Sequence, residues 1–383
     1  MGRIINVLEK VTDRKCFASF RRQLDREHAS VVEYDDFQHQ FMSQQGETIR
    51  YGGPRDVSLV AKQWLPRTPV FAYFLDGSRR TYKIADIPIG TQFFPLIAGQ
   101  VGVGVCRRDN KRLSACKLTM HTVMALPRKL DTEGKSERQC RAFFLNLKQK
   151  MNEGQLSNGV RSVVLDELLF YKTESNDNFE DKGIARIHEY MVEREKAMVN
   201  MLVEKNLLSD RAWLVKDGSL EYSRLADRAN PFVFSKIKNN YKRVVGVSKS
   251  FNPELAKLSN NKSAAKMIAE LKPLERTPAA MYSTDRVEGK FAVWYVRLRE
   301  PRLSRGPFDG IVKVEKILTT EREEEYGLDS AEVDNISAWI VNERNPVCYG
   351  KDERWANHLY PVYLTERFVK SKYRGTAHFI NLF

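Results

Sequence analysis

Short apolar runs separated by turn-forming residues predict several strands in the first third of the chain. The run VFAYFL at Val70–Leu75 ends at Asp76-Gly77, a dipeptide typical of turns. The next runs of strand character are Arg80–Ile89, Phe93–Cys106 and Leu118–Leu126. Consecutive strands with short connections favour an antiparallel meander at one side of a sheet. The closely spaced glycines of GQVGVG, inside the third run, indicate a bulge or a close backbone approach.

Beyond residue 130 the pattern changes to alternating helices and strands. Helices are expected where apolar residues recur every three or four positions, and strands where short apolar runs end at turn residues. The expected helices are Ser136–Met151, Ile184–Lys205, Ala331–Asn342 and Tyr363–Lys372. The expected strands are Arg161–Tyr171, Arg211–Lys216, Arg243–Val247, Phe291–Arg299 and Gly310–Ile317. Strands followed by alternating helices and strands favour an α/β fold, a mixed sheet flanked by helices.

The same pattern divides the chain into two unequal parts. Residues 1–65 are polar, with charge clusters such as RRQLDREH, and are expected to be mostly helical. Residues 66–383 are expected to form the sheet-based domain. Within it, residues 252–275 are rich in Lys and Asn and are expected to form a helical insertion.

Composition favours a globular protein of the cytoplasm. Hydrophobic residues make up 42% and aromatic residues 10%, enough for a substantial core. No apolar run approaches the roughly 18 residues of a membrane span, and MGRIINVLEKVTDRK has no apolar signal-peptide region. The five cysteines form no CxxC pair, which argues against a disulfide frame or a zinc site. We therefore expect reduced thiols and no membrane contact.

Charge adds a candidate partner. The chain carries 63 Lys and Arg against 49 Asp and Glu, a net charge of +14. An excess of cationic side chains favours binding to nucleic-acid phosphates, because neutralised phosphates release counterions. The alternative is a basic protein without a polyanion partner, and charge alone does not separate DNA from RNA or an acidic membrane.

Two aspartates stand out because each follows an apolar strand and opens the same turn. Asp76 lies in FLDGSRR and Asp217 in VKDGSLE. A carboxylate at a strand end lies at the rim of a sheet, where α/β folds bind ligands. Asp-Gly is also a common turn dipeptide, so either motif alone is weak. The pair favours a shared site.

A third acid is expected on the helix at Ile184–Lys205, between the two aspartates. Glu195 lies four residues after Met191 and three before Met198, so it belongs to the apolar stripe and should point at the sheet. A buried acid is costly unless it is paired or binds a metal ion. The alternative is a salt bridge to a core-edge Arg or Lys. Glu193 falls off the stripe, unless the helix phase differs by two residues.

These carboxylates suit a hard divalent cation. Mg²⁺ and Mn²⁺ prefer oxygen ligands and keep positions open for water and phosphate. Asp76, Glu195 and Asp217 are therefore the candidate metal ligands. Lys249 follows the strand RVVGVS and could offset negative charge that develops on a phosphate. The alternative for Lys249 is an ordinary surface lysine.

The order Asp, helical Glu, Asp resembles the acid order of RNase H-like nucleases. DGSR and DGSL resemble the two aspartate motifs of the NurA nuclease family, RVVGVSKSF its strand followed by a lysine, and FAVWYVRLR its aromatic strand. The similarity spans about residues 70–370, in short motifs whose order makes them specific. It implies an RNase H-like core, Mn²⁺-dependent exonuclease and endonuclease activity on DNA, a homodimer, and a HerA-type hexameric ATPase as partner.

The chain departs from the NurA pattern near its C-terminal end. The family usually carries a histidine after a YP-x-x-L stretch, whereas this chain reads HLYPVYLTERFVK. Glu366 is the nearest acidic substitute for the fourth site position, and His358 is the alternative. His378, in TAHF, lies too late and is expected to be a tail residue.

Two main hypotheses follow. The first is a metal-dependent nuclease with Asp76, Glu195, Asp217, Lys249 and Glu366 in its site. The second is a non-catalytic nucleic-acid-binding module with a degenerate RNase H or PIWI-like fold, and a scaffold that docks a motor is a weaker third. The intact acid set favours the enzyme. The sequence holds no GxxxxGK[ST] loop, HExxH or GxSxG motif.

Overall fold

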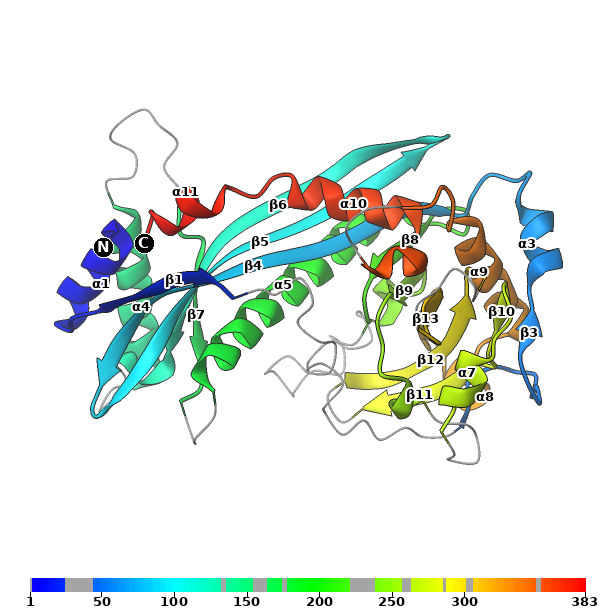
Figure 1. Ribbon diagram of the computed structural model, residues 1–383, viewed down its shortest axis with the longest axis horizontal. Helices are drawn as coiled ribbons and strands as arrows, with labels where there is room; N and C mark the ends of the chain where they lie inside the picture. Colours follow the sequence, from blue (N-terminus) through cyan, green and yellow to red (C-terminus); the bar gives the residue numbers. More distant parts are fainter. Residues whose placement is uncertain are drawn as a thin grey trace.

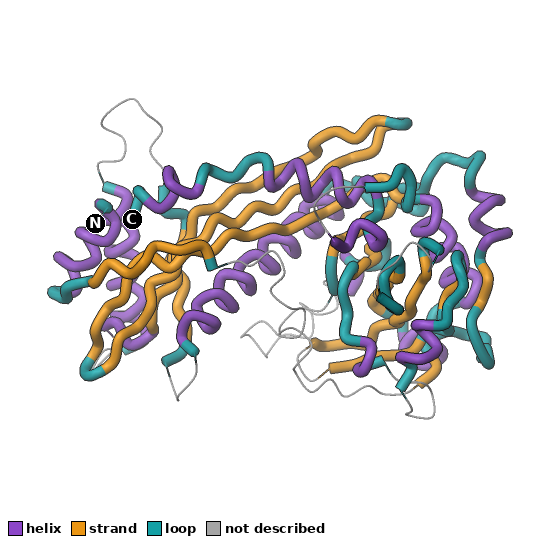
Figure 2. The backbone as a smooth tube through the Cα atoms, in the orientation of Figure 1, coloured by secondary structure: helices purple, strands orange, loops and turns teal. Residues whose placement is uncertain are grey.

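One large mixed sheet forms the framework of the protein. The computed structural model describes residues 2–24, 44–131, 136–153, 164–173, 178–220, 238–256, 263–284, 287–300, 306–348 and 353–383. Thirteen strands in these ranges join one sheet, in the order β2-β11-β12-β13-β9-β8-β4-β5-β6-β7, with β1, β3 and β10 attached beside this path. Helices flank the sheet (Figures 1 and 2). The predicted α/β class, a mixed sheet flanked by helices, is confirmed.

The predicted antiparallel meander is present, with longer strands than expected. It consists of β4 (Phe71–Ile89), β5 (Gln92–Asp109) and β6 (Arg112–Pro127). The predicted turn at Asp76-Gly77 is wrong, because β4 runs through both residues and pairs with β5 as far as Ile89↔Gln92. The chain reverses instead at Gly90, whose φ of +62° suits a residue without a Cβ.

Parallel strands adjoin the meander on both sides. On one side lie β8 (Trp213–Asp217) and β9 (Val244–Ser248), parallel to β4 and to each other. On the other side β7 (Glu167–Tyr171) runs parallel to β6. The sheet continues past β9 with antiparallel strands, namely β13 (Ile311–Ile317), β12 (Val287–Arg297), β11 (Ala280–Thr284) and β2 (Gln44–Gln45).

Two helices cover opposite faces of the sheet near its centre. Helix α5 (Phe179–Glu204) begins at Asn178, whose side chain caps the amide of Glu180, and packs on β4, β5 and β6. Helix α10 (Tyr360–Lys370) packs on β4, β5 and β8. In Figure 1 the two helices run on either side of the long strands. The sheet between them is therefore shielded on both faces.

Glycines let α10 approach closely. A Cβ added to Gly102 or Gly104 of β5 would lie 2.8 or 2.6 Å from a Val369 methyl group of α10. On the other face, a Cβ on Gly99 would meet Ile187 of α5 at 3.0 Å. The close backbone approach predicted from GQVGVG is thus confirmed.

The remaining helices lie at the two ends of the sheet. They are α1 (Arg3–Thr12), α3 (Ser58–Trp64), α4 (Glu137–Asn152), α7 (Ala265–Ala269), α8 (Glu321–Tyr326), α9 (Ser330–Asn342) and α11 (Thr376–Ile380). Short 3₁₀ turns occur at Arg128–Asp131, Pro253–Leu255 and Glu353–Asn357. No helix in the described ranges is long and apolar enough to span a membrane.

Two predictions about the flanking regions need correction. Residues 1–65 are not mostly helical where described, because β1 (Phe17–Gln23) pairs with β4 and β3 (Arg55–Asp56) pairs with β10 (Glu275–Arg276). Edge pairing with the long sheet overrides the local helical preference. The described part of the segment 252–275 holds the 3₁₀ turn, α7 and the first residue of β10, and residues 257–262 lie outside the described residues.

Candidate active site

The two aspartates lie on neighbouring strands. Strands β4 and β8 pair in parallel up to Leu75↔Lys216, so Asp76 and Asp217 occupy the next position on each strand. Asp217 is the last residue of β8, and Gly218 turns the chain away with a φ of +84°. Asp76 instead lies within β4, at the level where its parallel neighbour ends. The structure thus places the two DGS motifs side by side.

Asp76 is buried without a partner for one oxygen. The residue is 4% exposed, and its Oδ2 atom accepts no hydrogen bond. Burial raises the pKa of Asp76 well above its ordinary value, and the nearby Asp217 and Glu366 raise it further. Lys249 opposes this rise. An unsatisfied buried carboxylate is costly in folding, which is typical of a group retained for a ligand or a reaction.

Lys249 joins the second aspartate to the C-terminal helix. Its Nζ lies 2.7 Å from Asp217 Oδ2 and 2.8 Å from Glu366 Oε2. Burial alone would lower the pKa of Lys249, but Asp217, Glu366 and Asp76 outweigh it and raise this pKa. Lys249 is therefore held as a buried ammonium within the carboxylate cluster, and the surface-lysine alternative is wrong.

Glu366 belongs to the buried face of α10. That face consists of Pro361, Val362, Thr365, Glu366 and Val369, spaced as one stripe along the helix. Lys370, one turn later, donates to Glu366 Oε1 at 2.7 Å. Burial acts to raise the pKa of Glu366, but the ammonium groups of Lys249 and Lys370 lower it to about 2. Glu366 is thus an ionised member of the cluster.

Glu195 points at the sheet, as its helix phase predicts. It is 2% exposed, whereas Glu193 is partly exposed and lies 3.9 Å from Arg186. Its Oε2 atom lies 2.9 Å from Lys216 Nζ, so the salt bridge weighed as an alternative exists. Burial raises the pKa of Glu195, and Lys216 opposes the rise.

Glu195 reaches the site from the opposite face of the sheet. A Cβ on Gly77 would lie 2.2 Å from Glu195 Oε1, so Gly77 faces α5. Asp76 faces the other way, because neighbouring residues of a strand alternate between faces. Its cross-strand partner Gly104 abuts α10. The expectation that Glu195 joins Asp76 and Asp217 in one set of metal ligands therefore needs correction. Helices α5 and α10 approach from opposite faces, and the backbone of β4 lies between Glu195 and Asp76.

The two histidines considered for the site differ in burial. His358 is fully buried just before α10, with its ring edge-on to Tyr363 at 5.4 Å between centroids. His378 lies exposed on α11, near Arg374. Of the two candidates for the fourth position, the structure brings Glu366 to Lys249.

Sequence reasoning missed two lysines. Lys216 immediately precedes Asp217, and its Nζ donates to the Asp217 and Ser219 carbonyls in addition to the ion pair with Glu195. A lysine inside the apolar run AWLVK was a signal for a buried partner. Lys370 lies four residues after Glu366, the spacing of helical ion pairs. Lys216 thus neutralises Glu195, and Lys370 contributes to neutralising Glu366.

The donor chemistry of the cluster fits a divalent cation. Its carboxylates are hard oxygen ligands, and Asp76 Oδ2 is buried and unsatisfied. In the part of the chain that the structure describes, however, three or more acidic, His or Cys side chains do not converge as a ready-made metal site. The Lys249 ammonium stands between the carboxylates of Asp217 and Glu366 instead. Two features therefore fit a divalent cation: the oxygen donors, and the unsatisfied oxygen of Asp76 beside Asp217.

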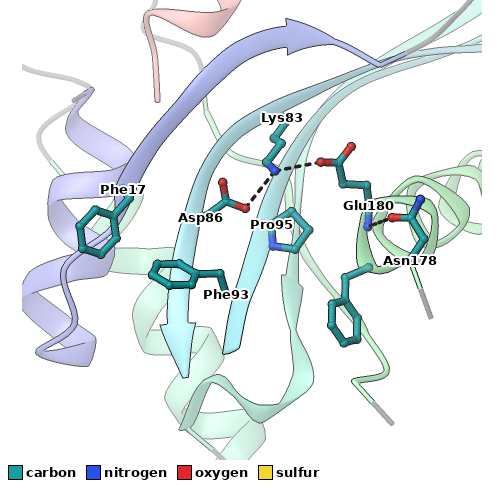
Figure 3. Close-up of a pocket in the computed structure, with 8 residues that line it drawn as sticks. Phe17, Lys83, Asp86, Phe93, Pro95, Asn178 and Glu180 are labelled. Carbon is teal, nitrogen blue, oxygen red and sulfur yellow. Dashed lines mark hydrogen bonds and ion pairs between the residues drawn. The ribbon is translucent and has the colours of Figure 1, made fainter. Parts of the chain in front are cut away.

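A separate hollow lies far along the same strands. It has a volume of about 580 Å³ and is lined by Phe17, Lys83, Asp86, Phe93, Pro95, Asn178, Phe179 and Glu180. Lys83 already pairs with Asp86 and Glu180, at 3.0 and 2.8 Å (Figure 3). Asp86 follows Asp76 by ten residues of one strand, roughly 33 Å at 3.3 Å per residue. The hollow is not part of the carboxylate cluster.

Comparisons with known proteins assign no family to this chain. No family model matches it, and no curated protein matches it significantly. Among solved structures, it is similar to the NurA nuclease from Sulfolobus solfataricus, with 10% sequence identity over 78% of each chain and a TM-score of 0.38. A likeness at this level decides neither the fold family nor the activity.

Proposed function

We propose that this protein is a metal-dependent nuclease that hydrolyses phosphodiester bonds in DNA. One observation carries the proposal: Asp76 is buried beside Asp217 with an unsatisfied carboxylate oxygen, at the level where the parallel strand β8 ends. Such an arrangement stores an electrostatic cost that a cation would relieve. The net charge of +14 supplies attraction for a polyanionic substrate.

The residues take distinct roles in this proposal. Asp76 and Asp217 would hold Mn²⁺ or Mg²⁺, whereas Glu195 lies on the other face of the sheet, that of α5, paired with Lys216. A bound cation would polarise the scissile phosphate and the attacking water. Lys249 fixes the carboxylates of Asp217 and Glu366 relative to each other, and its ammonium offsets negative charge at the reacting phosphate. Glu366 fills the fourth position.

The strand arrangement supports an RNase H-like core. The meander β4-β5-β6 is followed along the chain by α5 and then by β8 and β9, both parallel to the first strand of the meander. We take Asp76 on β4, Glu195 on α5 and Asp217 on β8 as the acids that the resemblance to NurA nucleases implies. We further propose a homodimer that processes DNA ends with a HerA-type hexameric ATPase.

The test is incubation of the purified full-length chain with end-labelled single- and double-stranded DNA in Mn²⁺, Mg²⁺ or EDTA. Cleavage is expected with either cation and not with EDTA. Asp76→Asn should abolish it, whereas the matched surface variant Glu193→Gln should cut normally. Light scattering, with and without a HerA-type ATPase, tests the proposed assembly.

The second candidate is a nucleic-acid-binding module without turnover. The observation in its favour is that a lysine, Lys249, stands between the carboxylates of Asp217 and Glu366, where a ligand set would leave room for a cation. Binding of both DNA forms with no cleavage under any cation would favour this module and overturn the nuclease.

A further inference from the structure

Lys249 is held in the cluster through both its ammonium group and its backbone carbonyl. Its Nζ contacts Asp217 Oδ2 and Glu366 Oε2, and its side chain is 10% exposed. The backbone is held as well, because the side-chain amide of Asn357 donates to the Lys249 carbonyl at 2.7 Å. The same Asn357 amide donates to the Ile311 carbonyl of β13 at 2.9 Å. The ammonium therefore has a fixed position between two carboxylates.

The carboxylates differ in whether their oxygens are already occupied. Both oxygens of Glu366 contact ammonium groups, Oε2 that of Lys249 and Oε1 that of Lys370. Asp217 Oδ2 contacts Lys249, and Glu195 Oε2 contacts Lys216. Asp76 Oδ2 is buried and has no hydrogen-bond donor. On the face of α10, the unmet demand for positive charge is thus concentrated at Asp76.

The net charge of the cluster also favours a single bound cation. On the face of α10, three carboxylates (Asp76, Asp217 and Glu366) and the two ammonium groups in contact with them (Lys249 and Lys370) leave one negative charge when all are ionised. One divalent cation turns this into one positive charge, which a single phosphodiester anion neutralises. Two divalent cations would leave three positive charges before the substrate binds, a large excess in a buried site.

We propose that the site binds one divalent cation, at Asp76 and Asp217, and that the Lys249 ammonium takes the place of a second. This inference rests on the metal dependence in the proposed function. It makes Lys249 the residue that sets the cation count, since removing its ammonium would free Asp217 and Glu366 for another ion.

The experiment measures Mn²⁺ stoichiometry in the full-length protein without DNA, by calorimetric titration and by electron paramagnetic resonance. Wild type is expected to bind one Mn²⁺ per chain, with the hyperfine pattern of an isolated ion. Lys249→Met is expected to bind two, with the exchange-coupled spectrum of ions roughly 3.5–4 Å apart. Lys249→Arg, which keeps the charge, and the exposed control Lys372→Met are expected to bind one.

The outcomes separate this inference from the proposed function. Two coupled ions in wild type would overturn the inference and leave a metal-dependent nuclease in place. One ion in both wild type and folded Lys249→Met would overturn the role of Lys249. No Mn²⁺ binding would overturn the metal dependence itself. If circular dichroism shows that Lys249→Met is unfolded, the counts for wild type and Lys249→Arg decide, and two ions in either overturn the inference.

Discussion

The Nζ of Lys249 lies within 2.8 Å of both Asp217 Oδ2 and Glu366 Oε2. One side chain thus connects the end of β9 to the end of β8 and to the middle of α10. Lys249 and Glu366 lie 117 residues apart in the sequence. The cluster is consequently part of what holds the C-terminal helix against the sheet.

Removing Glu366 should destabilise the fold. In Glu366→Ala the buried Lys249 loses one of two partners, and breaking a buried ion pair from one side costs about 3–5 kcal/mol. Urea unfolding should show a loss of this size. The control Glu193→Ala, a partly exposed residue 3.9 Å from Arg186, should stay within about 0.5 kcal/mol of wild type. Equal effects of the two changes would show that the cluster does not anchor α10.

Asp76→Asn should stabilise the protein when cations are removed. The change eliminates a buried carboxylate whose Oδ2 has no donor, so the free energy of unfolding in EDTA should rise by about 1–3 kcal/mol. Saturating Mn²⁺ should reverse the order. A ligand at a hundred times its Kd adds about 2.7 kcal/mol to wild type, and the variant should gain little. A Tm of wild type that is indifferent to Mn²⁺ would contradict this.

The pH dependence of stability should have opposite signs at Glu366 and Asp76. The pKa of Glu366 is lowered from 4.5 to about 2, so its contribution is present above pH 4.5 and is lost as the pH falls through about 2. The raised pKa of Asp76 means a cost that is absent below its ordinary value of 3.8 and grows as the pH rises above it. The stability gain of Asp76→Asn in EDTA should therefore vanish near about pH 3. A gain that persists there would have another cause.

Gly77→Ala should disturb the site from the side of α5. The new methyl group would meet Glu195 Oε1, Cδ and Cγ at 2.2, 2.9 and 3.0 Å, and overpacking costs about 1–3 kcal/mol. The double variant Gly77→Ala, Glu195→Ala should recover part of the loss, because the obstructing carboxylate is gone. Gly52→Ala, with open space around the added carbon, is the matched control. No recovery in the double variant would place the strain elsewhere.

Lys249 and surface cations should differ in DNA assays. Lys249→Ala should lower turnover by raising the activation free energy by about 2.7–4 kcal/mol, if it resembles the loss of one oxyanion donor. Its effect on DNA affinity should be small because the side chain is buried. Arg367 is exposed one residue after Glu366. Arg367→Ala should instead weaken DNA binding. It should also flatten the slope of log K against log salt concentration by about one unit, the contribution of one phosphate contact. A change confined to the salt slope in Lys249→Ala would refute its catalytic role.

Glu195 was predicted from sequence because burial leaves a periodic trace along a helix, whereas Glu366 was named only from its place in the C-terminal stretch. Glu195 lies four residues after Met191 and three before Met198, and Glu366 has the same spacing from Val362 and Val369. Both prove to be on the buried face. Neighbours along the chain therefore suffice to fix the phase of a helix.

Other features depend on residues distant in the sequence. Asp76-Gly77 has the local signature of a turn, yet pairing with the glycine-rich β5 carries the strand through it. The N-terminal segment forms β1 because β4 offers it an edge. Lys216 has its partner on another element, and no spacing in the sequence announces that pair.

At Gly77 and Gly104 the sheet is reduced to bare backbone, with α5 pressed against one side and α10 against the other. A single layer of peptide groups screens the charges on its two sides from each other only weakly. Charge altered on one helix should thus be felt by the other without any contact between them. Glu195→Gln and Glu366→Gln should accordingly be non-additive in a double-mutant cycle, so the two faces of the sheet would act as one titrating unit.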